Sequence, residues 1–351
     1  MKKKLLMTTV GILLVLALVL FLSQEKKTPV REPEQDDTIQ IGMSFDSFVI
    51  ERWLRDRDVF VSTARELGAE VNVQNANGDI EEQKKQIDYF IEKGMDAIVI
   101  ICIDSYGLRE HVQKALDAGI KVIAYDRLVT DANVDLYISF DNAMVGTMMA
   151  QALVDNGIGG GSVLMLGGSS SDSNVPMVEE AFRTVMREND VKILDSIHTA
   201  NWKAEIAATY IYENVSVVVR ADGIMCGNDN LASQVVPALA ARRMAGDIMV
   251  VGQDADLQAC QRIVEGTQLM TVYKPVEKLA KRAAECVVEL VKTGKVTGED
   301  VSTFDDGTYE VPYIGIMPVS VTEENIDEVI IDSGFHLKED VYLNVPGKMP
   351  K

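Results

Sequence analysis

The chain is poor in histidine and cysteine. Its 351 residues include three histidines, all isolated from one another, and four cysteines. The cysteines show neither the close spacing of a zinc site nor the density of a disulfide scaffold. They are Cys102, Cys226, Cys260 and Cys286. We therefore expect buried free thiols, no metal site and no cofactor.

Basic charge is also scarce. The chain has 34 Lys and Arg against 54 Asp and Glu, a formal net charge of -20 at pH 7. A sequence-independent grip on nucleic-acid phosphates needs clustered basic residues, so this charge excludes nucleic acid as a partner. The content of 47% hydrophobic residues is that of an ordinary globular protein. The length exceeds the usual size of one hydrophobic core, which predicts two domains.

Long apolar runs are absent except at the N-terminus. Three lysines at 2–4 precede an uninterrupted apolar run of 18 residues at 5–22, and a polar, proline-containing segment follows. A cleaved signal peptide usually has an apolar core of about 7–15 residues and a small-residue cleavage site. The apolar run here is longer than that, and no such cleavage site follows it. No cysteine lies near residue 22 to which a lipid could be attached. We predict that residues 1–22 form a retained membrane anchor, with a cleaved signal peptide as the alternative, and that a linker at 23–38 leads to an extracytoplasmic part.

From residue 39 onward, short β-rich runs alternate with helical patterns. One such pattern is 79–94, where Asp79 can cap the start of a helix and Gly94 suits its end. The predicted strands are 39–45, 70–75, 97–103, 121–125, 135–140, 162–167, 191–198, 223–227, 247–252 and 268–273. This alternation predicts an α/β fold with two doubly wound parallel sheets.

Polar side chains stand where these predicted strands end. The run "KVIAYDR" (121–127) ends in an acid and a base, and "DIMVVGQD" (247–254) ends in an acid. In doubly wound sheets ligands bind beyond the carboxyl ends of the strands. The polar residues at these ends are Asn75, Asn77, Asp104, Asp126, Arg127, Asp141, Asn142, Asp172, Asn174, Asn201, Trp202, Asn228, Asp229, Asp254 and Lys274.

Helix capping explains some of these Asp and Asn residues, but not Arg127, Trp202 or Lys274. Arginine and lysine donate hydrogen bonds, Asp accepts them, Asn does both, and tryptophan offers a flat apolar face. Such a set matches a pyranose sugar, which has a ring of hydroxyl groups and an apolar C–H face.

The sequence resembles bacterial D-xylose-binding proteins, which belong to the type I periplasmic sugar-binding proteins. The resemblance covers about residues 39–337. The segments that carry it are "IGMSFDSFVIERWLRDRDVF" (41–60), "VQNANG" (73–78), "AYDR" (124–127), "YISFDN" (137–142), "GGSSSDSN" (167–174), "GNDN" (227–230), "GQDADLQA" (252–259) and "GTQLMTVYKP" (266–275). One of these segments, "GGSSSDSN", departs from the usual pattern, and so does a further segment, "HTANW" (198–202).

The resemblance implies two α/β lobes joined by a three-segment hinge and closing on one sugar. The first lobe would comprise 39–140 and 272–313, and the second 141–271 and 314–351. The implied sugar contacts are Arg52, Trp53, Asp126, Arg127, Asn174, Trp202, Asn228, Asp254 and Lys274. Arg52 and Trp53 come from the resemblance alone, since the strand ends do not indicate them, and Trp53 can also be read as a core residue.

Two other classes of function fit the residues less well. Asp126 and Asp254 could form a glycosidase pair, but neighbouring cations suit them to accepting hydrogen bonds as ionised groups. The glycine-rich run 157–162 precedes a predicted strand, whereas a phosphate-binding loop follows one. We therefore expect binding without chemistry.

The expected ligand is D-xylose. Another aldose such as ribose or glucose, and a non-binding interaction module, are the alternatives. The implied membrane partner is an ABC importer or the extracellular domain of a sensor histidine kinase. The absence of a lipid-attachment cysteine and the short anchor with its linker fit the kinase role.

Overall fold

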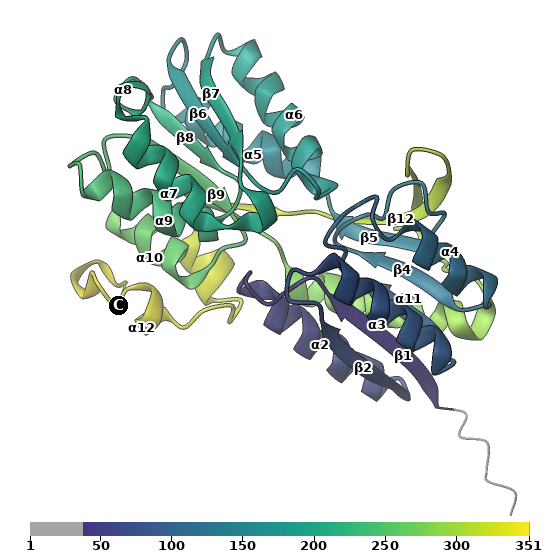
Figure 1. Cartoon of the computed structure of the whole chain (residues 1–351). Coiled ribbons are helices and arrows are strands. Elements are labelled where there is room, and N and C mark those ends of the chain that lie inside the picture. The colour runs from purple at the N-terminus through teal and green to yellow at the C-terminus, as the bar shows by residue number, and fades with distance from the viewer. Residues whose placement is uncertain (1–37, 351) are drawn as a thin grey trace, which may run out of the picture. The chain divides into compact units, whose positions relative to one another are not determined.

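The structure, a computed structural model, describes residues 38–350 (Figure 1). The predicted anchor at 1–22, and all of the predicted linker except residue 38, lie outside the described residues. Within 38–350, no helix is both long and apolar enough to cross a membrane.

The first lobe is built on a seven-stranded sheet with the order β11-β12-β5-β4-β3-β1-β2. All neighbouring strands pair in parallel except β11 and β12. The strands are β1 (Ile39–Phe45), β2 (Ala69–Asn75), β3 (Ala97–Ile100), β4 (Lys121–Tyr125), β5 (Leu136–Phe140), β11 (Ser302–Asp305) and β12 (Glu310–Ile316). The helices are α2 (Arg52–Glu66), α3 (Ile80–Glu92), α4 (Arg109–Asp117) and α11 (Val276–Thr293).

The second lobe is built on a six-stranded sheet with the order β13-β10-β9-β8-β6-β7, in which only β13 is antiparallel to its neighbour. The strands are β6 (Ser162–Gly167), β7 (Lys192–His198), β8 (Gly223–Cys226), β9 (Met249–Gln253), β10 (Met270–Tyr273) and β13 (Val319–Val321). The helices are α5 (Asn142–Asp155), α6 (Asn174–Glu188), α7 (Ala204–Glu213), α8 (Val215–Val218), α9 (Asp229–Ala240), α10 (Leu257–Glu265) and α12 (Lys338–Val341), with single turns at Ala200–Trp202, Asp327–Ile331 and Pro346–Lys348.

All ten predicted strands are confirmed, with end points that differ by a few residues. Strands β11, β12 and β13 were not predicted. The predicted helix at 79–94 is also confirmed as α3. Asp79 caps it as predicted, since its side chain accepts hydrogen bonds from the backbone N–H groups of Glu81 and Glu82. Gly94 follows the helix with a φ of +65°, a conformation that glycine adopts without a steric penalty.

The chain crosses between the two sheets three times: after β5, after β10 and after β12. Two crossings lie later than the predicted limits at 271 and 313. Strand β10 continues to Tyr273, which pairs with Val319, and β12 continues to Ile316, which pairs with Phe140. The backbone pairing thus keeps each strand in its own sheet up to the pocket described below.

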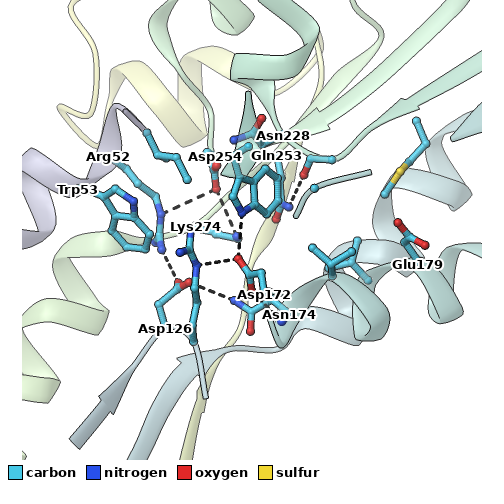
Figure 2. A pocket seen from close by; sticks show the side chains of 18 residues that line it. Arg52, Trp53, Asp126, Asp172, Asn174, Glu179, Asn228, Gln253, Asp254 and Lys274 are labelled. Atoms are coloured by element: carbon cyan, nitrogen blue, oxygen red, sulfur yellow. Dashed lines mark hydrogen bonds and ion pairs between the residues drawn. The ribbon is translucent and has the colours of Figure 1, made fainter. Parts of the chain in front are cut away.

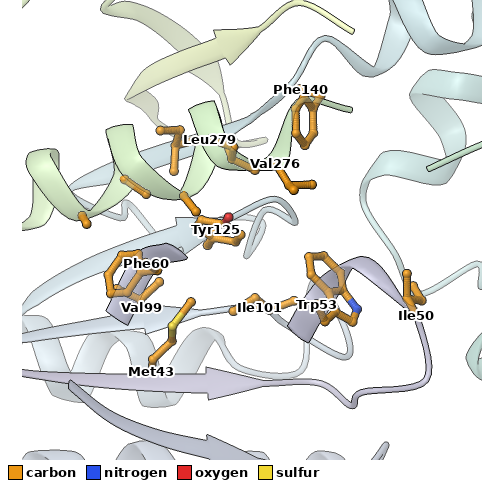
Figure 3. Close-up of a cluster of buried hydrophobic side chains, with 14 of the residues drawn as sticks. Met43, Ile50, Trp53, Phe60, Val99, Ile101, Tyr125, Phe140, Val276 and Leu279 are labelled. Atoms are coloured by element: carbon orange, nitrogen blue, oxygen red, sulfur yellow. The ribbon is translucent and has the colours of Figure 1, made fainter. Parts of the chain in front are cut away.

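One cluster of the first lobe's core lies between its sheet and the helices α2 and α11, and a second packs the sheet against α3 and α4. Figure 3 shows part of the first cluster, in which Phe60 of α2, Val99 of β3, Tyr125 of β4 and Leu279 of α11 are all buried. The four cysteines are buried and free, which confirms the expectation for them. A core of this kind fixes the helix that carries Arg52 relative to the strand that leads to Asp126.

Candidate functional site

The carboxyl ends of strands from both sheets meet at one pocket (Figure 2). It encloses about 450 Å³, including the part open to solvent. All nine residues predicted as sugar contacts line it. Its other lining residues are Ile50, Gly168, Asp172, Val175, Val178, Glu179, Met225, Gly227 and Gln253.

Asp126 and Asp254 occupy equivalent places in the two lobes. Each follows directly on a strand, β4 or β9, and each has a positive φ, 63° and 96° respectively. The backbone N–H of Asp126 donates to Ile138 O, and that of Asp254 donates to Val272 O, both at 2.8 Å. Each bond is made to the next strand of the same sheet, so the chain turns out of the sheet at the aspartate.

Asp126 is held as an acceptor of hydrogen bonds. Asn174 Nδ2 donates to its Oδ1 at 3.1 Å, and Arg52 Nη2 donates to its Oδ2. Burial tends to raise the pKa of Asp126, but the charges of Arg52, Lys274 and Arg127 outweigh it and hold the pKa below its ordinary value. Asp126 is therefore ionised at neutral pH.

The opposite side of the pocket carries buried polar atoms that lack hydrogen bonds among the described residues. They are Asp254 Oδ1, Asn228 Nδ2 and Gln253 Oε1. Asp254 Oδ1 lies 3.2 Å from Lys274 Nζ and 3.9 Å from Arg52 Nε, as ion pairs without hydrogen-bond geometry. Burying such atoms unpaired is unfavourable, so the pocket suits a ligand that both donates and accepts hydrogen bonds.

Arg127 is tied to protein groups on both lobes. Its Nη1 lies 2.7 Å from Asp46 Oδ2 and donates to Cys102 O at 3.1 Å. Its Nε lies 2.6 Å from Asp172 Oδ2, and the same oxygen accepts from Trp202 Nε1 at 3.2 Å. Burial raises the pKa of Asp172, although Arg127 acts against the shift. Asp172 thus orients both a cation and an indole.

The two tryptophans supply flat apolar surfaces to the pocket, beside the aliphatic side chains that also line it. Trp53 belongs to the core cluster, which confirms that reading, and it also stacks on Arg52, whose guanidinium carbon lies 4.1 Å from the ring centroid. Its contact with a sugar stays a prediction. Trp202 lies against the backbone at Gly168, where an added Cβ would come within 2.2 Å of the indole. Only glycine fits beside the ring at this point.

Several pocket residues were absent from the predicted contacts. Asp172 was among the polar residues at the predicted strand ends, but it was not among the sugar contacts that the resemblance implied. Gln253 is the last residue of β9, and Asp46, which contacts Arg127 without lining the pocket itself, directly follows β1. Their position at strand ends was the signal that could have found them. Some other strand-end residues are helix caps, since Asp141 accepts from Met144 N and Asn228 Oδ1 accepts from Leu231 N.

Another buried acid, Asp229, connects two of the loops that carry pocket residues. Asp229, at the start of α9, accepts from Thr271 Oγ1 at 2.6 Å, from Gln268 Nε2 at 2.8 Å and from Asp256 N at 3.3 Å. These bonds connect the loop of Asn228 with the loop that follows Asp254. Burial raises the pKa of Asp229 to about 7, although Arg262 acts against the shift.

The raised pKa of Asp229 predicts a pH dependence of stability. Between its unfolded pKa of about 4 and its folded value, the folded chain holds more protons than the unfolded chain. The contribution of Asp229 to the free energy of unfolding therefore falls as the pH rises from about 4 to about 7. We expect the melting temperature of the sugar-free protein to drop more between pH 5 and pH 7.5 in the wild type than in Asp229→Asn, as measured by calorimetric scans. Parallel pH profiles would contradict this.

Comparison with known proteins places the chain among relatives. The model of the periplasmic binding protein domain matches residues 41–295. The D-xylose-binding periplasmic protein of Haemophilus influenzae is 40% identical over 310 residues, which cover 87% of this chain and 92% of the relative. The protein of the same name from Escherichia coli is 39% identical over 309 residues, covering 86% and 92%.

Solved structures agree with this. An ABC transporter solute-binding protein from Clostridium phytofermentans with bound β-D-glucose has a TM-score of 0.78 and 26% identity, and the match covers 86% of this chain and 99% of the other. A carbohydrate transporter solute-binding protein from Chloroflexus aurantiacus in complex with D-glucose gives 0.78 and 28%, with coverages of 86% and 98%. The family is non-enzymatic, which confirms the expectation of binding without chemistry. The chain therefore belongs to the type I periplasmic sugar-binding proteins, as a relative of the D-xylose-binding proteins.

Proposed function

We propose that the chain is an extracytoplasmic D-xylose-binding protein. The observation that carries the proposal is the gathering of the nine predicted contact residues around one pocket, which also contains buried donors and acceptors without hydrogen-bond partners in residues 38–350. The names of the two relatives at 39–40% identity support xylose as the sugar.

In the proposed complex, Asp126 and Asp254 accept hydrogen bonds from sugar hydroxyls on opposite sides of the ring. Arg52, Lys274 and the unpaired Nδ2 of Asn228 donate to the sugar oxygens. Hydrogen bonds to charged groups are stronger than neutral ones, and more so away from water. The indoles of Trp53 and Trp202 cover the apolar faces of the ring.

This arrangement predicts selectivity among sugars. A hydroxyl that points the wrong way leaves a buried group unpaired, which costs about 1–3 kcal/mol per group. Another aldose such as ribose or glucose is the alternative ligand, and the two glucose-bound solved relatives favour glucose among these. A non-binding interaction module is the remaining alternative.

Isothermal calorimetry of the purified full-length chain in mild detergent tests the proposal. D-xylose is compared with ribose, arabinose, glucose and galactose. We expect saturable heat with xylose and an affinity about tenfold or more lower for the other sugars, in line with one unpaired polar group. Tighter binding of glucose would move the proposal to a hexose. No heat with any of the five would overturn it.

For the membrane partner we propose the permease of an ABC importer, because both sugar-bound solved relatives are transporter solute-binding proteins. Sensing with a histidine kinase rests on the N-terminal segment, which lies outside the described residues, and so stays a prediction. Retention of the anchor stays a prediction for the same reason. Purification of the chain from crosslinked membranes in the presence of xylose distinguishes the two partners: we expect a permease to co-purify with it, whereas a histidine kinase would favour the sensing role.

A further inference from the structure

A buried acid lies behind the pocket without lining it. Asp56 stands one helical turn after Arg52 on α2 and is fully buried. Its Oδ1 accepts a hydrogen bond from the hydroxyl of Tyr125, the last residue of β4. Its Oδ2 lies 3.8 Å from Arg52 Nη1, and neither atom has a hydrogen-bond partner among the described residues. Asp56 is therefore placed to act on Arg52 but not on a ligand.

The pair of Asp56 and Tyr125 is held rigidly in the first lobe. The ring of Tyr125 meets that of Phe60 edge to face, with centroids 6.5 Å apart, inside the cluster drawn in Figure 3. Its hydroxyl reaches Asp56 from the sheet, while the carboxylate itself comes from α2. The position of Asp56 is thus fixed from two elements at once.

The guanidinium of Arg52 is surrounded by three carboxylates. Asp126 contacts it through Nη2, Asp254 lies 3.9 Å from Nε, and Asp56 lies 3.8 Å from Nη1. Trp53 covers one face of the group. Asp126 and Asp254 line the pocket, whereas Asp56 does not. If Asp56 lost its charge, Arg52 would be drawn toward the two acceptors that a sugar needs.

We propose that Asp56 and Tyr125 are positioning residues that hold Arg52 in the orientation in which it donates to the sugar. The inference rests on the proposed function. Asp56 balances the pull of Asp126 and Asp254, so that both keep oxygen lone pairs available to sugar hydroxyls. Tyr125 fixes the carboxylate of Asp56 through its hydrogen bond.

The charge of Asp56 changes near neutral pH, which offers a readout beyond affinity itself. Burial raises the pKa of Asp56 to about 7, and the charge of Arg52 and the hydrogen bond from Tyr125 act against the shift. The charged and titratable groups facing it are Arg52 on α2, Tyr125 and Asp126 at the end of β4, and Asp254 at the end of β9. As the pH rises through about 7, Asp56 ionises and its hold on Arg52 strengthens, so the affinity for sugar increases.

Calorimetric titration of the full-length chain with D-xylose at pH 6, 7 and 8 tests the role of Asp56. We expect Asp56→Asn to raise the Kd about tenfold at pH 8, roughly the loss of one hydrogen bond. We also expect the variant to show a flatter pH profile than the wild type. Since Asp229 also titrates near pH 7, the difference between the two profiles is the quantity that counts. Asp58→Asn, an exposed acid on the same helix, is the matched control and should bind like the wild type.

Tyr125→Phe provides a second test that preserves the ring and its packing. It should weaken binding as well, and the double variant with Asp56→Asn should lose less than the sum of the two single effects, because the residues act as one unit. Wild-type affinity and a wild-type pH profile in folded Asp56→Asn or Tyr125→Phe would overturn the inference. No heat in the wild type would instead contradict the proposed function.

Discussion

Replacing Asp254 by asparagine is expected to raise the Kd for D-xylose by about 100-fold or more, which corresponds to two charge-assisted hydrogen bonds at about 1.5–3 kcal/mol each. The side chain keeps its size, but one of its two acceptor oxygens becomes a donor group. Lys274, which lies 3.2 Å from the carboxylate, loses its ionic partner. Calorimetric titration with xylose measures the loss.

Asparagine is the right substitution at this position because Asp254 has a φ of 96°, and asparagine tolerates a positive φ better than most residues do. Asp247→Asn, an exposed acid before the opposite end of β9, serves as the control. Undiminished binding in Asp254→Asn would mean that this carboxylate faces no sugar hydroxyl.

The second large effect is expected for Arg127→Met. The change removes the charge between Asp46 and Asp172, which lie 2.7 Å and 2.6 Å from its nitrogens. Leaving buried carboxylates without their cation costs about 3–5 kcal/mol. We therefore expect a large fall in the free energy of unfolding, measured by denaturant titration, together with loss of xylose binding, since Asp172 also orients Trp202.

Arg57→Met is the matched control, because Arg57 is partly exposed and forms an ion pair only with the neighbouring exposed Asp58 among the described residues, besides lying 5.5 Å from the ring centroid of Phe48. It should change the stability by less than about 1 kcal/mol. If Arg127→Met loses binding at unchanged stability, Arg127 is a direct sugar contact and the ion pairs with Asp46 and Asp172 contribute little to the fold.

Much of the fold could be predicted because most of the strands up to β10 are short apolar runs bounded by polar residues, and β2 and β7 alternate apolar with polar residues. The three strands that the sequence does not predict lack these patterns. Strand β11 is largely exposed, β12 contains Pro312 and Gly315, and β13 spans three residues. Proline and glycine are unfavourable inside strands, so the sequence of β12 does not predict a strand. The three segments become strands because they pair with neighbouring strands in the sheets.

The sequence could predict those site residues that stand at the ends of strands. Asp126, Asp254 and Lys274 stand at strand ends, where the fold places ligands. Arg52 and Trp53 lie on α2, and only resemblance to a family indicated them. The role of Asp172 depends on contacts with Arg127 and Trp202, which are distant in sequence, so no local pattern reports it.

The equivalent turns at Asp126 and Asp254 have a consequence for the history of the molecule. Apart from the outer edge strands, the two sheets have the same strand order, with β4 in one corresponding to β9 in the other. The two aspartates therefore follow corresponding strands, a repetition that duplication of one half would produce. In the proposed complex the sugar, which has no such symmetry, would meet one aspartate from each lobe, and the guanidinium of Arg52 lies between the two carboxylates as a cation that both share.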